Sequence, residues 1–176
     1  MAGNTPQEAV RAFVAPLQAA LVCFADGRVT ADTRRLGVEG VLAVNGGQPF
    51  RLNGERVSLS ATMRYELVRA EAPQGPYKVS TRGWIYHLYG ARNKRLVGYH
   101  WHPLSDSHAK HPHLHAFEMG DKKHYPTGRI LFEDVLDLAR EYGVEPRDRA
   151  KWVDVATANR ANFALGATWG IWVSAV

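Results

Sequence analysis

Apolar residues recur at helical spacing near the start of the chain, in residues 6–27. The apolar face of this predicted helix is formed by Val10, Phe13, Val14, Leu17 and Leu21. Thr5 can cap its N-terminus, Pro6 suits the first helical position, and Gly27 marks its end. Pro16 lies inside the pattern and predicts a kink or a break, because proline removes a helical hydrogen bond.

The middle of the chain changes to a two-residue alternation of apolar and polar side chains, which is typical of strands. The predicted strands are residues 38–44, 49–52, 60–70, 77–90, 95–103 and 111–118. Residues 90–94 are predicted to form a hairpin turn between two of these strands. The last strand is expected near the edge of the sheet, because Pro112 cannot donate a hydrogen bond to a ladder.

Helical spacing returns in the last third of the chain. A helix is predicted after Thr127, which can cap it, and Gly143 ends it. Pro146 starts a second helix, and the apolar tail 168–176 is expected to dock on the body. We therefore predict one domain over residues 1–176, of the α+β class: an N-terminal helix, an antiparallel β-sheet, and two C-terminal helices packed on the sheet.

The composition narrows the environment and the partners. The 176 residues include 22 Lys and Arg against 17 Asp and Glu, and this net charge of +5 favours a polyanion such as RNA or a nucleotide as partner. Cys23 is the only cysteine, which excludes intramolecular disulfides and Cys-rich zinc sites. The sequence has no secretory signal and no apolar run of membrane-spanning length, so we expect a cytoplasmic protein with no membrane partner.

Aromatic residues alternate along the strands on either side of the predicted hairpin, at Trp84, Tyr86, Tyr99 and Trp101. Such residues on strands usually belong to the core. If they were exposed, they could instead stack on unpaired bases while neighbouring basic side chains contact phosphates. The core is the stronger interpretation.

Histidine is the most unusual feature of the composition. Residues 100–115 hold six of the eight histidines, and His124 follows closely. Two sets of alternating histidines are predicted to share a face of their strand: His100 with His102, and His111 with His113 and His115. If the two strands are neighbours, five imidazoles converge on one patch. This density predicts a functional site.

A metal site is one interpretation of the patch. Histidine pairs on strands can supply nitrogen ligands to zinc, manganese or nickel, with a further ligand from Glu118 or Asp106. Alternate Cβ atoms of a strand stand roughly 6.5–7 Å apart, so one ion should draw its ligands from both strands. The candidate ligands are His100, His102, His113 and His115. Because no carboxylate has a diagnostic spacing, zinc is the alternative, and the leading prediction has no cofactor.

Metal-free phosphoryl chemistry is the leading interpretation. One imidazole can accept a proton, a second can donate one, and neighbouring cations can hold the phosphate. We predict His113 and His115 as base and acid. The other candidate catalytic residues are His100, His102 and His111. The candidate substrate-binding residues are Lys122, Lys123, Tyr125 and Arg129.

Two resemblances add to this interpretation. Residues 111–117, His-Pro-His-Leu-His-Ala-Phe, resemble the motif of the histidine triad (HIT) nucleotide hydrolases and transferases. That resemblance implies His113 as nucleophile, with His111 and His115 as its partners. In size, basicity and layout the chain is similar to the ribonuclease toxins of toxin–antitoxin pairs, as in the RelE-like group, which cleave RNA without metal.

The second resemblance implies a toxin-like endoribonuclease, with RNA as substrate and an antitoxin protein as partner. We take metal-independent phosphodiester cleavage by the histidines as the leading prediction. The alternatives are a HIT-type nucleotide hydrolase or phosphoramidase, and a metal-binding or nucleic-acid-binding module without turnover.

Overall fold

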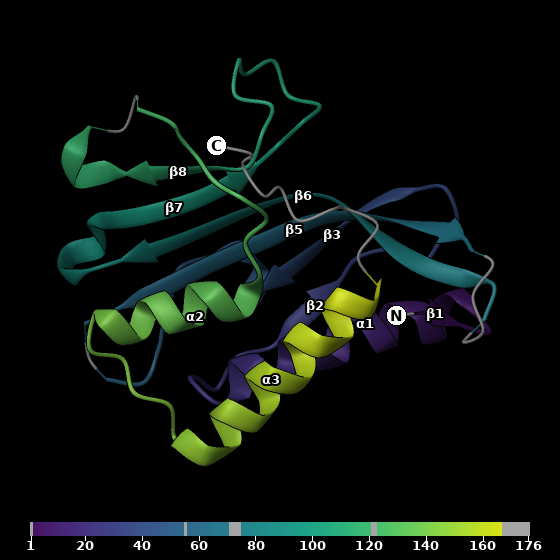
Figure 1. Cartoon of the computed structure of the whole chain (residues 1–176), viewed down its shortest axis with the longest axis horizontal. Helices are drawn as coiled ribbons and strands as arrows, with labels where there is room; N and C mark the ends of the chain where they lie inside the picture. Colours follow the sequence, from purple (N-terminus) through teal and green to yellow (C-terminus); the bar gives the residue numbers. More distant parts are fainter. Residues whose placement is uncertain (1, 55, 71–74, 121–122, 167–176) are drawn as a thin grey trace, which may run out of the picture.

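The chain folds into an antiparallel β-sheet with three α-helices, and the predicted α+β class is confirmed (Figure 1). A computed structural model describes residues 2–54, 56–70, 75–120 and 123–166. The helices are α1 (Pro6–Val22), α2 (Phe132–Glu141) and α3 (Arg149–Gly166). In this part of the chain, no helix has the length and apolar character needed to cross a membrane.

The strands of the described residues form one sheet, whose main path runs in the order β2-β3-β5-β6-β7-β8-β9. The strands are β1 (Ala2–Gly3), β2 (Val29–Ala31), β3 (Glu39–Val44), β4 (Phe50–Arg51), β5 (Ser58–Arg69), β6 (Tyr77–Tyr89), β7 (Arg95–Trp101), β8 (His113–Ala116) and β9 (Tyr125–Pro126). The 3-10 turns are η1 (Asn45–Gly47), η2 (Ala91–Asn93) and η3 (Phe117–Met119). The predicted hairpin at residues 90–94 joins β6 to β7. In Figure 1, β7 and β8 lie at the end of the sheet away from β2.

The hydrophobic core lies between the sheet and the helices. Alternate residues of β6 and β7 point into it, and Trp84, Tyr86 and Trp101 are all buried. The ring of Tyr86 packs against Phe132 of α2, with ring centroids 6.1 Å apart. The core interpretation is therefore confirmed for these three side chains, which are not available to stack on bases. Tyr99 is partly buried and packs against the same core. We call this side of the sheet the helix face.

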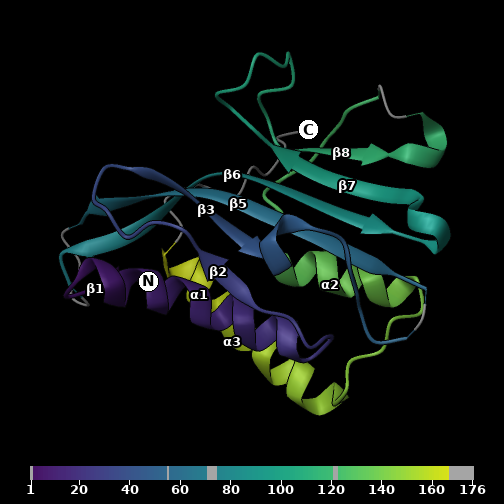
Figure 2. The ribbon, with the colours of Figure 1, turned by 180° about the vertical axis from the view of Figure 1, so that it is seen from behind.

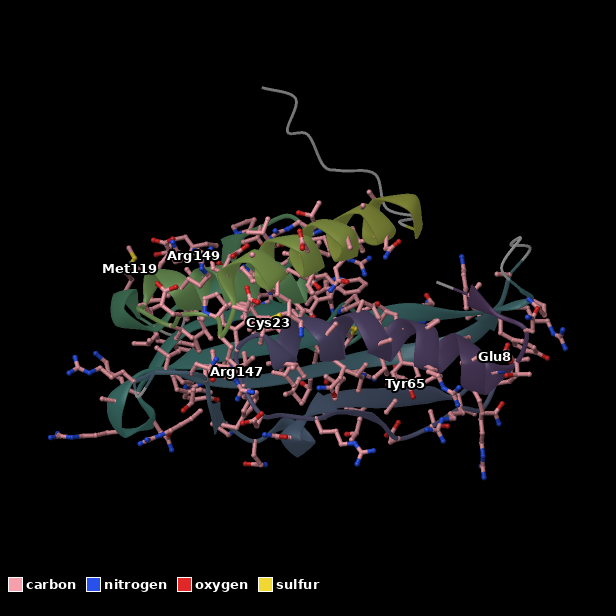
Figure 3. The ribbon with its side chains drawn as sticks, turned by 90° about the horizontal axis from the view of Figure 1, so that it is seen from below. Glu8, Cys23, Tyr65, Met119, Arg147 and Arg149 are labelled. Carbon is pink, nitrogen blue, oxygen red and sulfur yellow. The ribbon has the colours of Figure 1, made fainter. Side chains whose placement is uncertain are left out.

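The helices form a second layer over the helix face. Figure 3 shows α1 and α3 running beside each other, with Cys23 at the end of α1. The Asn159 side chain of α3 donates to the Pro16 carbonyl of α1 at 2.9 Å. Cys23 is buried, as its apolar sequence neighbours indicate.

Two helix predictions need correction. α1 runs through Pro16 as one helix, so the predicted break does not occur, because packing against the sheet and α3 holds the helix on both sides of the proline. α2 begins at Phe132 and not near Thr127, because the Leu131 N–H donates to the Asp134 carboxylate at 2.8 Å and fixes the first turn there. The predicted docking of the tail at 168–176 lies outside the described residues.

Candidate functional site

The face of the sheet turned away from the helices carries imidazoles where the helix face carries aromatics. Across β7 and β8, His100 pairs with His113, while Gly98 pairs with His115 on one side and His87 on the other. Residues that pair directly across antiparallel strands point to the same face, so these four histidines lie together. Seen from behind, β7 and β8 have no described helix over them (Figure 2). We call this side the histidine face.

Seven histidines form one cluster of neighbouring rings on this face. The members are His87, His100, His102, His108, His113, His115 and His124. Ring centroids of neighbours lie between 4.4 and 5.9 Å apart. His108 and His124 come from the loops that follow β7 and precede β9, and their ring nitrogens are 3.2 Å apart. The predicted convergence of histidines from two strands is therefore confirmed, since β7 and β8 are neighbours.

Gly98 provides the space in which the rings meet. A Cβ atom at Gly98 would lie 2.5 Å from Cδ2 of His87 and 3.1 Å from Nε2 of His100. Atoms do not approach so closely, so any larger residue at this position would push the two rings apart. The absence of a side chain in the middle of β7 is what lets imidazoles from three strands touch.

His113 is the central member of the cluster. It is only 2% exposed, and its Nδ1 lies 2.8 Å from the His111 carbonyl oxygen. A carbonyl can only accept, so Nδ1 carries the proton and Nε2 carries the lone pair. This Nε2 atom is buried and has no hydrogen-bond partner among the described residues. Three other buried side-chain atoms of the described residues also have no partner, and Nε2 of His113 is the one that lies among the histidine rings.

His102 has the same protonation pattern. The Ser105 hydroxyl donates its one hydrogen to the His102 carbonyl at 2.9 Å. It must then accept from Nδ1 of His102, which lies 2.6 Å away. The lone pair of a neutral His102 is therefore on Nε2, as in His113.

The ring of His100 is held in place by the ring of His87. Its Nε2 lies 2.7 Å from Nε2 of His87, so one of the two nitrogens carries the shared proton. When that proton is on His100, its Nδ1 keeps a lone pair and His87 fixes the orientation of the ring. Metal-binding histidines commonly have such an outer hydrogen-bond partner.

Two groups of three histidines are close enough to hold an ion, and both include His113. The inner triad is His100, His102 and His113, and the outer triad is His113, His115 and His124. In each triad the ligand nitrogens lie within 4.8 Å of one another. Because Nδ1 of His113 is already used, its single lone pair can serve only one triad at a time. The cluster can therefore place one ion at His113, in either of two overlapping positions.

Burial lowers the pKa of three imidazoles in the middle of the cluster. Burial, with the neighbouring His87 and His115, lowers the pKa of His100 to about 2. Burial and the nearby Arg95 guanidinium lower the pKa of His87 to about 4. Burial also lowers the pKa of His113, against the opposing effect of its hydrogen bond to a backbone carbonyl. A metal ligand must be a neutral imidazole, so the lowered pKa values of His100 and His113 favour metal binding by these two rings.

One catalytic candidate lies outside the cluster. The predicted common face of His111 with His113 and His115 is wrong, because β8 begins at His113 and His111 lies exposed in the bend before it. Pro112 has no N–H for the ladder and restricts the backbone of the residue before it, so β8 starts only after this proline. His111 contributes its carbonyl oxygen and not its ring.

The candidate substrate-binding residues are dispersed. Arg129 lies on the helix face, with its guanidinium 5.6 Å from the Trp84 ring and 4.5 Å from the Phe163 ring, so it does not join the histidines. Tyr125 pairs with Leu114, which alternates with His113 and so points to the opposite side of β8. Lys123 is exposed.

Two further sequence candidates cannot be placed. Lys122 lies outside the described residues, and so does the side chain of Glu118, one of the acidic residues proposed as a further metal ligand. The other acidic residue, Asp106, is exposed and belongs to neither triad.

Sequence reasoning missed His87, the histidine that holds His100. The signal was partial, because a plain count outward from the turn at residues 90–94 pairs His87 with Val97. A register irregularity between Leu88 and Tyr89 moves its partner to Gly98, two residues before His100. His108 and His124 had no such signal, since loops bring them into the cluster.

Comparison of the chain with protein-family models, with curated proteins and with solved structures finds no match. The geometry and protonation of the histidine cluster are therefore the basis for assigning a function.

Proposed function

We propose that the histidine face is a zinc-class metal centre that supports hydrolytic chemistry, with His100, His102 and His113 as ligands. The observation that carries this proposal is Nε2 of His113, a buried lone pair with no partner among the described residues. Leaving such a nitrogen unsatisfied costs about 1–3 kcal/mol, and a bound metal ion would offset that cost.

The inner triad is favoured over the outer triad by its hydrogen bonds. His102 and His113 each donate Nδ1–H to an oxygen, which leaves both Nε2 atoms for an ion. The ring centroids of the inner triad are 5.0, 5.6 and 5.9 Å apart. Zinc bonds of about 2.0–2.1 Å place the ring centroids of tetrahedral ligands roughly 5 Å apart and their nitrogens roughly 3.3 Å apart. Small rotations of the rings would close the triad.

The donor set indicates the class of metal and of chemistry. Three imidazoles suit zinc, nickel, copper or cobalt, whereas magnesium and calcium prefer oxygen ligands. Three protein ligands leave a fourth tetrahedral position for water or substrate, as in catalytic and not structural zinc sites. An ion bound there supplies a Lewis acid that activates water near neutral pH.

Zinc competition tests the proposal directly. Zinc affinity is measured against a chromophoric chelator for the wild type and for His113→Ala, His102→Ala and His111→Ala. His111→Ala is the matched control, because it removes an exposed ring close to the cluster and keeps the carbonyl that His113 uses. We expect one zinc per chain, a loss of more than about 100-fold in affinity for the first two variants, and no change for the control.

The same samples test hydrolysis. Zinc-loaded wild type should hydrolyse 4-nitrophenyl acetate faster than metal-free protein, and His113→Ala should remove the difference. Equal zinc affinity in the wild type and in His113→Ala would overturn the assignment.

Metal-free cleavage of RNA, predicted from the sequence, is a second candidate. The contact between His87 and His100 favours it, because two imidazoles 2.7 Å apart share one proton. The low pKa of both rings acts against it, since the leaving oxygen needs a protonated acid. Cleavage of an RNA oligonucleotide that survives removal of all metal, and is lost in His100→Ala, would select this function. The HIT-type activity and the antitoxin partner stay predictions.

A further inference from the structure

We propose that the histidine face binds the phosphoryl group of an anionic substrate and that Arg95 is the residue that recognises it. This inference rests on the proposed metal centre, which would act on the same group. Arg95 is the first residue of β7, two strand positions before Val97, where β7 begins to pair with β8.

Arg95 lies at the border of the histidine cluster. Its guanidinium carbon is 4.5 Å from the centre of the Phe117 ring. The same ring stacks nearly parallel on His115, at 5.7 Å and 13°, and lies 5.8 Å from the ring of His87. Phe117 therefore connects the guanidinium to two histidines of the cluster.

The stacking leaves the hydrogen-bond donors of Arg95 available. A cation–π contact uses the flat face of the guanidinium, whereas its five N–H groups point outward in the plane. The contact with Phe117 thus orients the Arg95 guanidinium and leaves its N–H groups able to donate. Within the part of the chain that the structure describes, no carboxylate pairs with Arg95.

Two other arginines of the sheet are different in this respect. Arg64 of β5 is paired with Glu39, and Arg82 of β6 is paired with Glu66. Both pairs neutralise their charge locally. Arg95 has no such carboxylate partner among the described residues and lies beside the histidine cluster, so its charge can serve an anion bound there.

The charge around the cluster also favours an anionic substrate. Both triads consist of histidines alone, so a bound divalent ion would keep its full charge of +2. Among the residues that the structure describes, the charged neighbours that act on His87 and His100 are Arg95 and other histidines. An anion is needed to balance a divalent ion and a guanidinium together.

Phosphate fits these two cations better than a carboxylate does. A phosphoryl group carries up to two negative charges and presents several oxygens in a tetrahedral arrangement. One oxygen can approach the metal position while others accept from the guanidinium fork. A carboxylate has a single charge and two oxygens in one plane.

The test uses inorganic phosphate as the probe and the ³¹P line width as the readout. Phosphate is titrated against metal-free and zinc-loaded full-length protein, in the wild type, Arg95→Gln and Arg69→Gln. Arg69 is a matched control, because it lies 5.5 Å above the Tyr77 ring in the same kind of contact at the far end of β5 and β6. Acetate, followed by its ¹H line width, is the comparison anion.

We expect Arg95→Gln to raise the Kd for phosphate roughly tenfold or more, because a hydrogen bond to a charged group is lost. Zinc affinity of Arg95→Gln and phosphate affinity of Arg69→Gln should equal those of the wild type. Acetate should bind more weakly than phosphate.

The outcomes separate the two proposals. If zinc binds and Arg95→Gln keeps wild-type phosphate affinity, Arg95 is not the recognition residue and only the metal centre stands. If zinc does not bind but phosphate binding to the metal-free protein requires Arg95, the metal centre fails and the phosphate site stands. Equal binding of acetate and phosphate, or equal losses in both arginine variants, overturns the phosphoryl proposal.

Discussion

Strands β6 and β7 present two opposite kinds of surface on their two faces. Toward the helices they place Trp84, Tyr86 and Trp101, whose buried aromatic area stabilises the fold. Toward the other side they place His87 and His100, whose burial removes charge from the imidazoles and gains little apolar contact. The comparison teaches that one face holds the sheet together, while the other carries a cost that a bound ligand would offset.

The largest expected effect is on the helix face. Leu88 is fully buried in the core, so Leu88→Ala should lower the free energy of unfolding by about 2–5 kcal/mol. Chemical denaturation of the metal-free protein measures this change. In that form His113→Ala should cost less than Leu88→Ala, because it also removes a buried nitrogen without a partner among the described residues. The reverse order would mean that the histidine face also stabilises the fold.

The second effect appears only when metal is present. Zinc at about 1,000 times its Kd should raise the free energy of unfolding of the wild type by about 4 kcal/mol. Leu88→Ala should gain a similar amount, whereas His113→Ala should gain almost nothing. His111→Ala serves as control and should respond like the wild type. An equal gain in His113→Ala would place the metal elsewhere.

A smaller effect tests the spacing of the rings. In Gly98→Ala the new Cβ would meet the His87 ring at 2.5 Å, so His87 can no longer hold His100 in place. Loss of an outer hydrogen-bond partner lowers metal affinity by about 10–100-fold. Chelator competition measures this, with circular dichroism to confirm that the variant is folded. Gly128→Ala is the control, because a Cβ there meets no atom within 4 Å. Unchanged zinc affinity in Gly98→Ala would remove His87 from the metal site.

The smallest effect is expected for a polar contact of β5. Arg64 forms an ion pair with Glu39, and both side chains are more than one third exposed. Solvent screens such a pair, so Arg64→Gln should change the free energy of unfolding by less than about 1 kcal/mol. Thermal and chemical denaturation should both show this. A loss comparable to that of Leu88→Ala would contradict the division between a stabilising face and a functional face.

The sequence predicted the features that depend on local periodicity. Alternation along β6 and β7 predicted the buried aromatics, and the turn at residues 90–94 predicted the hairpin. The start of α2 was predicted too early, because a backbone hydrogen bond to Asp134 decides it and residue type alone favoured Thr127. The density of histidines between residues 100 and 124 predicted that most of the rings of the cluster would be neighbours.

Only the tertiary structure decided which histidines meet. Pairing of β6 with β7 brings His87 to His100, and pairing of β7 with β8 brings His113 beside them. Because β8 starts only at His113, the ring of His111 is excluded, and packing under the helices takes Arg129 to the other face.

The physical reason is that periodicity is a property of neighbouring residues, whereas contact between strands depends on the whole fold. Alternation in the sequence determined that β6 and β7 would have two unlike faces. Hydrophobic burial then selected the aromatic face for the helices and left the histidine face uncovered by any described helix. The backbone carbonyl of His111 accepts from Nδ1 of His113 and so places the lone pair of the ring on Nε2. The direction of that carbonyl could not be read from the sequence.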